Sequence, residues 1–278
     1  KAPEVASTLV VSGGTFTEEI PAKFCARGFG SVQDGDLYTV MPKESTKWDP
    51  DNGEFAIFTE EDLKDFRDRV NDGDDFAGVT VTLNADLDLK SESSWTPIGT
   101  GKRDGRNAKD AKPFCGVFDG QKHTISNLTI DNKAMSTRPD AKEAFGLFGV
   151  VDGGTVKNLT LDAVSLKVEN NSVMGGAIGL LIHNGTAENI TVTGELEADQ
   201  GLGGIVGRMT DAGRIANCTN EATVTGKSTN TAGIVGAAYY TQKGCRMDVI
   251  DCTNTGKISG SDIQVETRVP IPNTKAKR

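Results

Sequence analysis

The sequence has few of the residues and segments that identify the common function classes. Its 5 cysteines form no Cys-x-x-Cys pair, and it has only 2 histidines, which suits neither a zinc site nor a dense disulfide scaffold. Its apolar stretches, such as 176–182, are far shorter than the roughly 18 residues of a membrane span. A GxSxG elbow, an HExxH helix and a Walker loop are all absent. We therefore expect no membrane insertion, no cofactor and no motif-encoded catalysis.

Charge and composition narrow the class further. Thirty Lys and Arg against 39 Asp and Glu give a formal net charge of -9, which removes the electrostatic basis for binding nucleic acid or anionic lipid. Aromatic residues make up only 6%, whereas 33 of the 278 residues are glycine. Apolar content carried by small and β-branched residues, with so much glycine, indicates a globular chain with many turns.

Two short motifs recur with a common period of about 30 residues. The first is an Asn, an apolar residue and Thr, with Asp replacing Asn in the last copy; the second is a Gly-x-x-Gly box. The first motif begins at Asn127, Asn158, Asn189, Asn217 and Asp251, and the boxes begin at Gly146, Gly176, Gly204 and Gly233. Interleaved motifs that share one period indicate a repeat architecture.

The spacing within each repeat predicts a coil of parallel strands. Apolar residues stand two before, one after and three after the Asn, as Val156, Leu159 and Leu161 do around Asn158. Two strand alternations joined by one extra residue predict a corner, and Asn tolerates the left-handed backbone that a corner needs. A unit of short strands cannot bury its own inner face, so the repeats must stack. We expect an all-β solenoid in which the five motif positions form a structural, hydrogen-bonded ladder.

These motifs resemble a known repeat family. The Gly-Ile-Val-Gly boxes at Gly204–Gly207 and Gly233–Gly236, the Asn-Leu-Thr units and the entry run Phe118–Ile125 look like the GLUG-like repeats of bacterial cell-surface proteins. The resemblance spans about Trp95 to Gly260. It implies a right-handed parallel β-helix and a secreted or cell-surface location.

The flanks of the repeats complete the predicted organisation. Residues 58–73 form an amphipathic helix: Thr59 is its N-cap, Asp62 its capping-box partner, and Leu63, Phe66 and Val70 its apolar stripe. Such a helix would cover the open end of the solenoid. We predict a small β appendage at 1–41, a linker at 42–54, the β-helix at 55–265 with the capping helix at about 59–72, an insertion at 102–112, and a polar tail at 266–278.

Candidate chemistry is scattered. His123 and His183 stand at turn or surface positions, and the acidic turns 49–53 and 72–75 lack a complete EF-hand loop. Paired carboxylates of a β-helical polysaccharide lyase or glycoside hydrolase are the enzyme alternative. The candidates do not converge in the sequence: Asp86, Asp88, Asp119, Asp162, Glu195, Glu197 and Asp199. We assign no catalytic, cofactor-binding or metal-binding residue.

Taken together, these features favour an adhesin-like, non-catalytic binding protein that displays loops from a rigid β-helix. Its expected partner is an extracellular glycan or a host or matrix protein, with no nucleic acid. The Asn-x-Thr units are interpreted as ladder residues, not as glycosylation acceptors. Cys218 and Cys252 occupy equivalent repeat positions, and we expect them to be stacked, free thiols because parallel strands hold their Cβ vectors nearly parallel.

Overall fold

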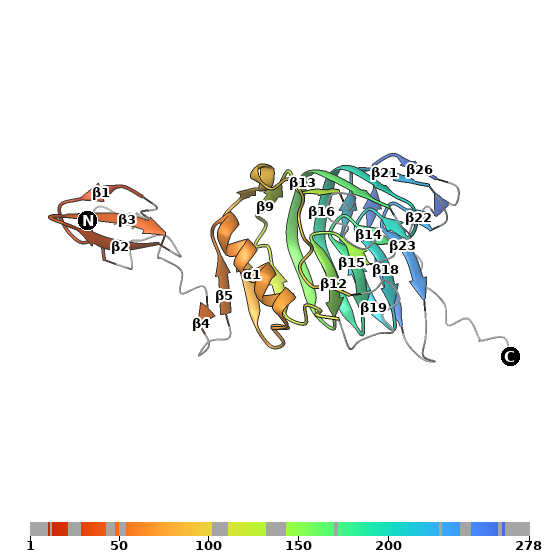
Figure 1. Cartoon of the computed structure of the whole chain (residues 1–278), viewed down its shortest axis with the longest axis horizontal. Helices are drawn as coiled ribbons and strands as arrows, with labels where there is room; N and C mark the ends of the chain where they lie inside the picture. The colour runs from red at the N-terminus through yellow and green to blue at the C-terminus, as the bar shows by residue number, and fades with distance from the viewer. Residues whose placement is uncertain are drawn as a thin grey trace, which may run out of the picture.

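The protein is all-β apart from one α-helix and one short 3-10 turn in the part of the chain that the structure describes. The computed structural model describes residues 11, 13–21, 29–42, 48–49, 54–101, 111–131, 143–169, 172–227, 230–239, 246–260 and 263–264. Figure 1 shows a small N-terminal sheet and a larger coil of stacked strands. Most of the predicted insertion 102–112, the tail 266–278 and most of the linker 42–54 lie outside the described residues.

The N-terminal sheet has three antiparallel strands in the order β1-β3-β2. They are β1 (Thr15–Phe16), β2 (Phe29–Asp34) and β3 (Leu37–Pro42). Gly35, with φ 62°, makes the turn between β2 and β3, where a left-handed backbone suits glycine.

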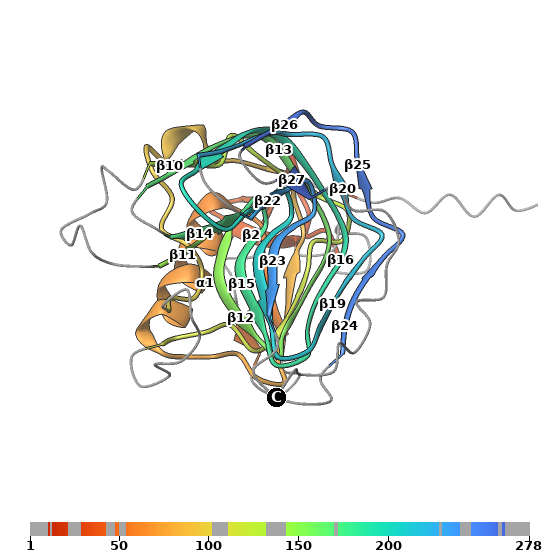
Figure 2. The ribbon, with the colours of Figure 1, turned by 90° about the vertical axis from the view of Figure 1, so that its right-hand side faces the viewer.

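The coil is built on one long sheet whose strands stack in the order β24-β19-β16-β13-β8-β6-β5-β4. Every pairing within it is parallel except that of β4 with β5. The path strands are β4 (Trp48–Asp49), β5 (Glu54–Ile57), β6 (Thr80–Leu83), β8 (Val117–Asp119), β13 (Thr155–Val168), β16 (Gly185–Ala198), β19 (Gly213–Ala216) and β24 (Met247–Ile250). Shorter strands continue the coils: β7 (Leu87–Asp88), β9 (Thr124–Ser126), β10 (Thr129–Asp131), β20 (Thr219–Asn220), β21 (Thr223–Gly226), β25 (Thr253–Asn254) and β26 (Ile258–Ser259). The predicted parallel β-solenoid is confirmed (Figure 2).

Two further parallel sheets close the later coils, from Ala144 onward. One contains β11 (Ala144–Phe145), β14 (Val173–Gly175), β17 (Leu202–Gly203), β22 (Thr231–Ala232) and β27 (Ile263–Gln264), and the other β12 (Phe148–Asp152), β15 (Ile178–Ile182), β18 (Val206–Thr210) and β23 (Val235–Tyr239). Each Gly-x-x-Gly box lies where the chain passes from the first of these sheets to the second. A Cβ on Gly207 would lie 2.6 Å from the backbone carbon of Met174 in the preceding coil. Close approach of two backbones therefore requires glycine at this position.

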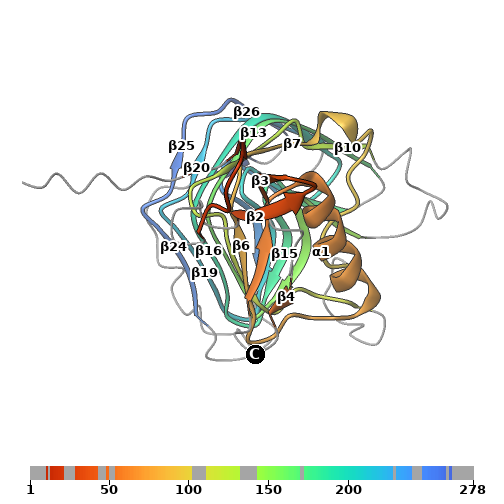
Figure 3. The same cartoon turned by 90° about the vertical axis from the view of Figure 1, so that its left-hand side faces the viewer.

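Helix α1 (Glu60–Asp72) lies beside β5 at the N-terminal part of the coil and occupies one side of it (Figures 1 and 3). The Thr59 hydroxyl accepts a hydrogen bond from the Asp62 backbone, and the Asp62 carboxylate accepts one from the Thr59 backbone, so the predicted capping box is present. Gly73, with φ 115°, ends the helix. Leu63, Phe66 and Val70 are fully buried, as the predicted apolar stripe requires.

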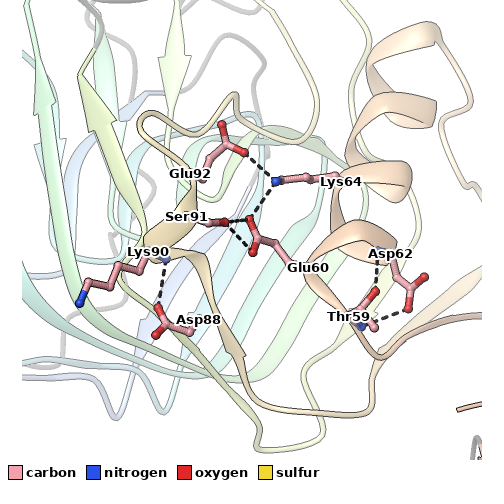
Figure 4. A network of polar contacts seen from close by, with 8 residues as sticks. All are labelled: Thr59, Glu60, Asp62, Lys64, Asp88, Lys90, Ser91 and Glu92. Carbon is pink, nitrogen blue, oxygen red and sulfur yellow. Dashed lines mark hydrogen bonds and ion pairs between the residues drawn. The ribbon is translucent and has the colours of Figure 1, made fainter. Parts of the chain in front are cut away.

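A polar network ties this helix to the first coil (Figure 4). Lys64 Nζ lies 2.8 Å from Glu60 Oε1 and 3.0 Å from Glu92 Oε2. The hydroxyl of Ser91, in the 3-10 turn Leu89–Ser91, donates to Glu60 at 2.6 Å. These contacts fix the first turn of α1 against the chain that follows β7.

The register corrects one part of the predicted repeat. Ile125 pairs with Leu161, and Thr129 pairs with Ser165 instead of Thr160. Asn127 therefore lies at the corner after that of Asn158. The reason is the length of this coil. Ile125 pairs with a residue 36 positions further along the chain, whereas Leu159 pairs with Ile190, 31 positions further along. A constant spacing of 31 therefore assigns Asn127 to the wrong corner.

The cysteines within the described residues are free. Cys218 is buried and Cys252 half-buried in successive coils. The hydrogen bond between the two thiols, together with burial, raises the pKa of Cys218 well above its ordinary range. Burial and the nearby carboxylates of Asp75 and Asp152 raise the pKa of Cys115 to about 11. A raised thiol pKa favours the protonated form, which is a weak nucleophile. Cys25 and Cys245 lie outside the described residues.

Candidate functional site

The predicted asparagine ladder occupies a corner on the surface of the coil. Asn158, Asn189, Asn217 and Asp251 follow one another in register with φ between 52° and 56°. Asn189 Nδ2 donates to Asn158 Oδ1 at 2.9 Å. Asn158 is half-buried and the other three are exposed, so the column lies outside the apolar core. Asn127 is not in this column, and its Nδ2 donates to Asp88 Oδ1 at 2.7 Å.

Further residues, which the repeat pattern did not reveal, extend this ladder toward the N-terminus. Asn158 Nδ2 donates to Asp119 Oδ1 at 3.0 Å, and Gln121 Nε2 donates to Asn84 Oδ1 at 3.1 Å. Partial burial opposes the charge of Asp119, but hydrogen bonds from Asn158 and the Gln121 backbone and the contact with Lys157 outweigh it, so the pKa of Asp119 is lowered. The Asp-Gly turn in the entry run was the available signal, because it precedes an Asn corner by one coil.

A second polar column lies inside the core. Asn220, fully buried, donates through Nδ2 to Asn254 Oδ1 at 2.6 Å and to the Ala222 carbonyl at 3.2 Å. The same position is Val192 in the preceding coil. A Cβ on Gly204 would lie 2.3 Å from Cγ of Asn220. The box glycine thus makes room for the buried amide, and the pair replaces an aliphatic layer of the core.

Both histidines contact a carboxylate of the preceding coil. His123 Nδ1 lies 3.0 Å from Asp86 Oδ1, and His183 Nδ1 lies 2.7 Å from Asp152 Oδ1. The hydrogen bond from the Thr124 backbone, followed by the His123 contact, lowers the pKa of Asp86. The histidines stand at turns, as predicted, but the sequence did not reveal their partners. Each pair links two adjacent coils at the surface.

The most concentrated carboxylates surround one lysine where β13, β16 and β21 end. Lys227 Nζ lies 2.9 Å from Glu197, 3.7 Å from Asp199 and 3.8 Å from Glu169. The hydrogen bond from Lys227 lowers the pKa of Glu197. A general acid of a glycosidase needs a raised pKa, whereas the pKa of Glu197 is lowered, so the contact with Lys227 favours an ion pair.

The remaining carboxylate candidates make separate contacts. Hydrogen bonds from Asn127 and the Lys90 backbone lower the pKa of Asp88, and Asp162 accepts from the Thr193 hydroxyl at 2.7 Å. In the turn 72–75, Asp74 pairs with Arg69 at 2.7 Å. Among the residues that the structure describes, no group of three or more His, Cys, Asp or Glu side chains is placed to hold a metal ion. In the same residues, no helix is long and apolar enough to cross a membrane.

Comparison with known proteins places the repeat in a named motif class. Residues 198–225 match the model of the GLUG motif; they run from the end of β16 into β21 and include the box Gly204–Gly207. The chain is 36% identical to Halomucin of Haloquadratum walsbyi over 136 residues, which is 46% of this chain and 1% of the length of that protein. A solved structure from Bacteroides ovatus, provisionally described as an immunoglobulin A1 protease, has a TM-score of 0.49 and 18% identity over 80% of this chain and 77% of that one. The chain is thus a β-solenoid that carries a GLUG motif, as the repeat predicts.

Proposed function

We propose that the chain is a non-catalytic binding module of a secreted or cell-surface protein. A mucin is a secreted or surface protein, so the likeness to part of Halomucin supports this location. The acidic surface agrees with it, because a net charge of -9 favours solubility. The partner class is an extracellular glycan or a matrix protein, bound by residues on the outside of the coil.

One observation carries the proposal: the polar side chains that could have served catalysis hold adjacent coils together. Asp86, Asp88, Asp119 and Asp162 each accept a hydrogen bond from the next coil. Catalysis on a polysaccharide needs two carboxylates directed at one bond. Carboxylates that bond to the next coil rigidify the scaffold instead, and a rigid scaffold lowers the entropic cost of ordering a binding surface on association.

The test combines a binding screen with a degradation assay on the same purified chain. Immobilised glycans and matrix proteins such as collagen are screened for saturable binding, and soluble polysaccharides are followed for newly released reducing ends or unsaturated products. We expect binding to at least one surface component and product formation equal to that of heat-denatured protein. Degradation above that control would refute the non-catalytic assignment, and a screen without any binding would refute the module's role in recognition.

The enzyme alternative has one specific observation in its favour. Glu169, Glu197 and Asp199 all lie within 3.8 Å of Lys227 Nζ, so their oxygens are near enough to act on one glycosidic bond. If the screen does reveal degradation, Glu197→Gln is expected to abolish it, while Glu188→Gln, on the same strand, is the matched control. Equal activity of both variants would exclude this cluster.

A further inference from the structure

The side chains on the outer face of the sheet β12-β15-β18-β23 change from apolar in the earlier coils to polar and aromatic in the later ones. Met209 and the partly buried Ala238 pack on the main core, so the alternating residues beside them lie on the outer face. Two columns in register run along this face: Val150, Leu180, Arg208 and Ala237, and Asp152, Ile182, Thr210 and Tyr239. In the earlier coils the face is a small apolar cluster separate from the main core. On β18 and β23 it carries a cation, a buried hydroxyl and an exposed aromatic ring.

These three side chains are organised together. The guanidinium carbon of Arg208 lies 5.0 Å from the centroid of the Tyr239 ring, a cation–π geometry that orients both groups. Tyr239 is 44% exposed, an unusual exposure for a large aromatic side chain in this coil. Thr210 pairs with Tyr239 in the sheet and is only 6% exposed, and its Oγ1 has no hydrogen-bond partner. A buried hydroxyl without a partner costs free energy that a ligand group could recover.

The backbone beneath the three side chains is held rigidly by the glycine boxes. A Cβ on Gly236 would lie 2.6 Å from the backbone carbon of Leu202, as one on Gly207 would from Met174. Both strands are therefore packed directly on the backbone of the preceding coil. Side chains on strands fixed in this way are positioned more accurately than side chains on loops.

We propose that Arg208, Thr210 and Tyr239 form a subsite for a carboxylate-bearing sugar ring of an acidic polysaccharide. The proposal rests on the proposed function and names its ligand class. The planar guanidinium matches a carboxylate with two parallel hydrogen bonds. The exposed ring of Tyr239 packs on the apolar face of the sugar while its hydroxyl remains available for a hydrogen bond.

The test uses polygalacturonate and its fully methyl-esterified form as probes of the full chain. Esterification removes the charge and leaves the sugar ring, so we expect binding of polygalacturonate at least about tenfold tighter than of the ester, as for loss of a charged contact. Tyr239→Ala and Arg208→Gln are each expected to weaken binding about tenfold or more, since aromatic and arginine contacts dominate binding energies. Arg208→Lys keeps the charge but loses the two-bond geometry, and is expected to weaken binding by a smaller factor.

Ile250→Ala is the matched control, because Ile250 is also an exposed apolar residue of a late coil, at 36% exposure. The affinity of this variant for polygalacturonate should stay within about twofold of the wild type. Thermal unfolding of each variant verifies the fold. Equal binding of acid and ester, or unchanged affinity of Tyr239→Ala, would overturn the subsite. Binding of other glycans in the screen without binding of polygalacturonate would overturn it too, yet leave the proposed function standing; absence of all binding would instead reject the proposed function.

Discussion

The two ends of the coil fill the same space with different side chains. Near helix α1 the interior contains six phenylalanines, whose neighbouring ring centroids lie between 5.0 and 6.4 Å apart. In the later coils the interior holds aliphatic residues, the thiol of Cys218 and the amide pair Asn220 and Asn254. The backbone path nevertheless repeats from coil to coil in continuous parallel register.

This difference indicates that the strands and glycine boxes set the spacing of the coils, and that core side chains then fill whatever volume remains. The aromatic end is where α1 must be docked, and Phe66 of α1 contacts five other rings. Large buried areas contribute most to stability. The N-terminal end should therefore hold most of the side-chain packing energy, and the later coils should depend more on backbone pairing.

Phe66→Ala should give the largest loss. Phe66 is fully buried, and removing a buried phenylalanine costs about 3–5 kcal/mol. Val224→Ala removes a fully buried residue from a later coil and should cost less, since about 0.8 kcal/mol is lost per buried methylene before any cavity term. Urea unfolding of both variants measures the difference, with the exposed Glu61→Ala as control. Equal losses for Phe66 and Val224 would remove the proposed asymmetry between the two ends.

Gly207→Ala tests the role of the box glycine. The new Cβ would meet the backbone of Met174 at 2.6 Å and the Gly179 carbonyl at 2.7 Å, and backbone cannot move aside as a side chain can. We expect a loss of about 1–3 kcal/mol, as in overpacked cores. Gly13→Ala is the control, because no atom lies within 4 Å of a Cβ at that position. A thermal midpoint of Gly207→Ala equal to that of Gly13→Ala would mean that the boxes do not set the spacing of the coils.

The features that the sequence predicts correctly are those that a short-range sequence pattern determines. The cap at Thr59, the end of α1 at Gly73 and the box at Gly204–Gly207 each depend on a few neighbouring residues. The motif search misplaced Asn127, because it assumes a constant coil length, whereas paired residues are 36 positions apart between β9 and β13 and 31 apart between β13 and β16. It also missed the carboxylate partners of the histidines, for His183 and Asp152 lie 31 residues apart. Contacts between coils depend on the exact register of the strands. An error at one corner therefore changes which residues are expected to meet.

The buried amide pair gives an intermediate effect. Asn220→Val copies Val192 of the preceding coil but leaves the side-chain oxygen of Asn254 without its donor, which should cost about 1–3 kcal/mol. Changing both residues to Val removes both partners and should recover most of that stability, because an apolar pair of similar shape can be nearly neutral. A double-mutant cycle by urea unfolding gives the coupling. Additive losses would show that the two amides do not depend on each other.

The surface ladder should contribute less than the buried pair. Asn189→Asp retains a residue type that tolerates φ 54°. The variant loses the hydrogen-bond donor to Asn158 Oδ1 and places a carboxylate beside that oxygen. We expect a loss of about 0.5–1.5 kcal/mol at neutral pH, the usual net value of one hydrogen bond. Asn217→Asp, at an equivalent corner, is the comparison variant. A loss above that of Asn220→Val would reverse the order of the two columns.

The smallest expected effect is the pH dependence contributed by Asp119. Its pKa is lowered in the folded chain because the hydrogen bonds and Lys157 outweigh partial burial. A lowered folded pKa gives stability that is present above the unfolded value of about 3.9 and is lost as pH falls through the folded pKa. Wild type should therefore exceed Asp119→Asn in stability near pH 6, and the gap should close in acid.

Urea midpoints of both proteins between pH 6 and the most acidic pH at which the fold persists measure this gap directly. The exposed Asp36→Asn, in the turn of the N-terminal sheet, shares the change of one charge without a contact to the ladder, so subtracting its pH profile removes the general effect of net charge. A gap that widens in acid would have the wrong sign for a lowered pKa. It would mean that burial, and not the contacts with Asn158 and Lys157, determines the ionisation of Asp119 at the start of the ladder.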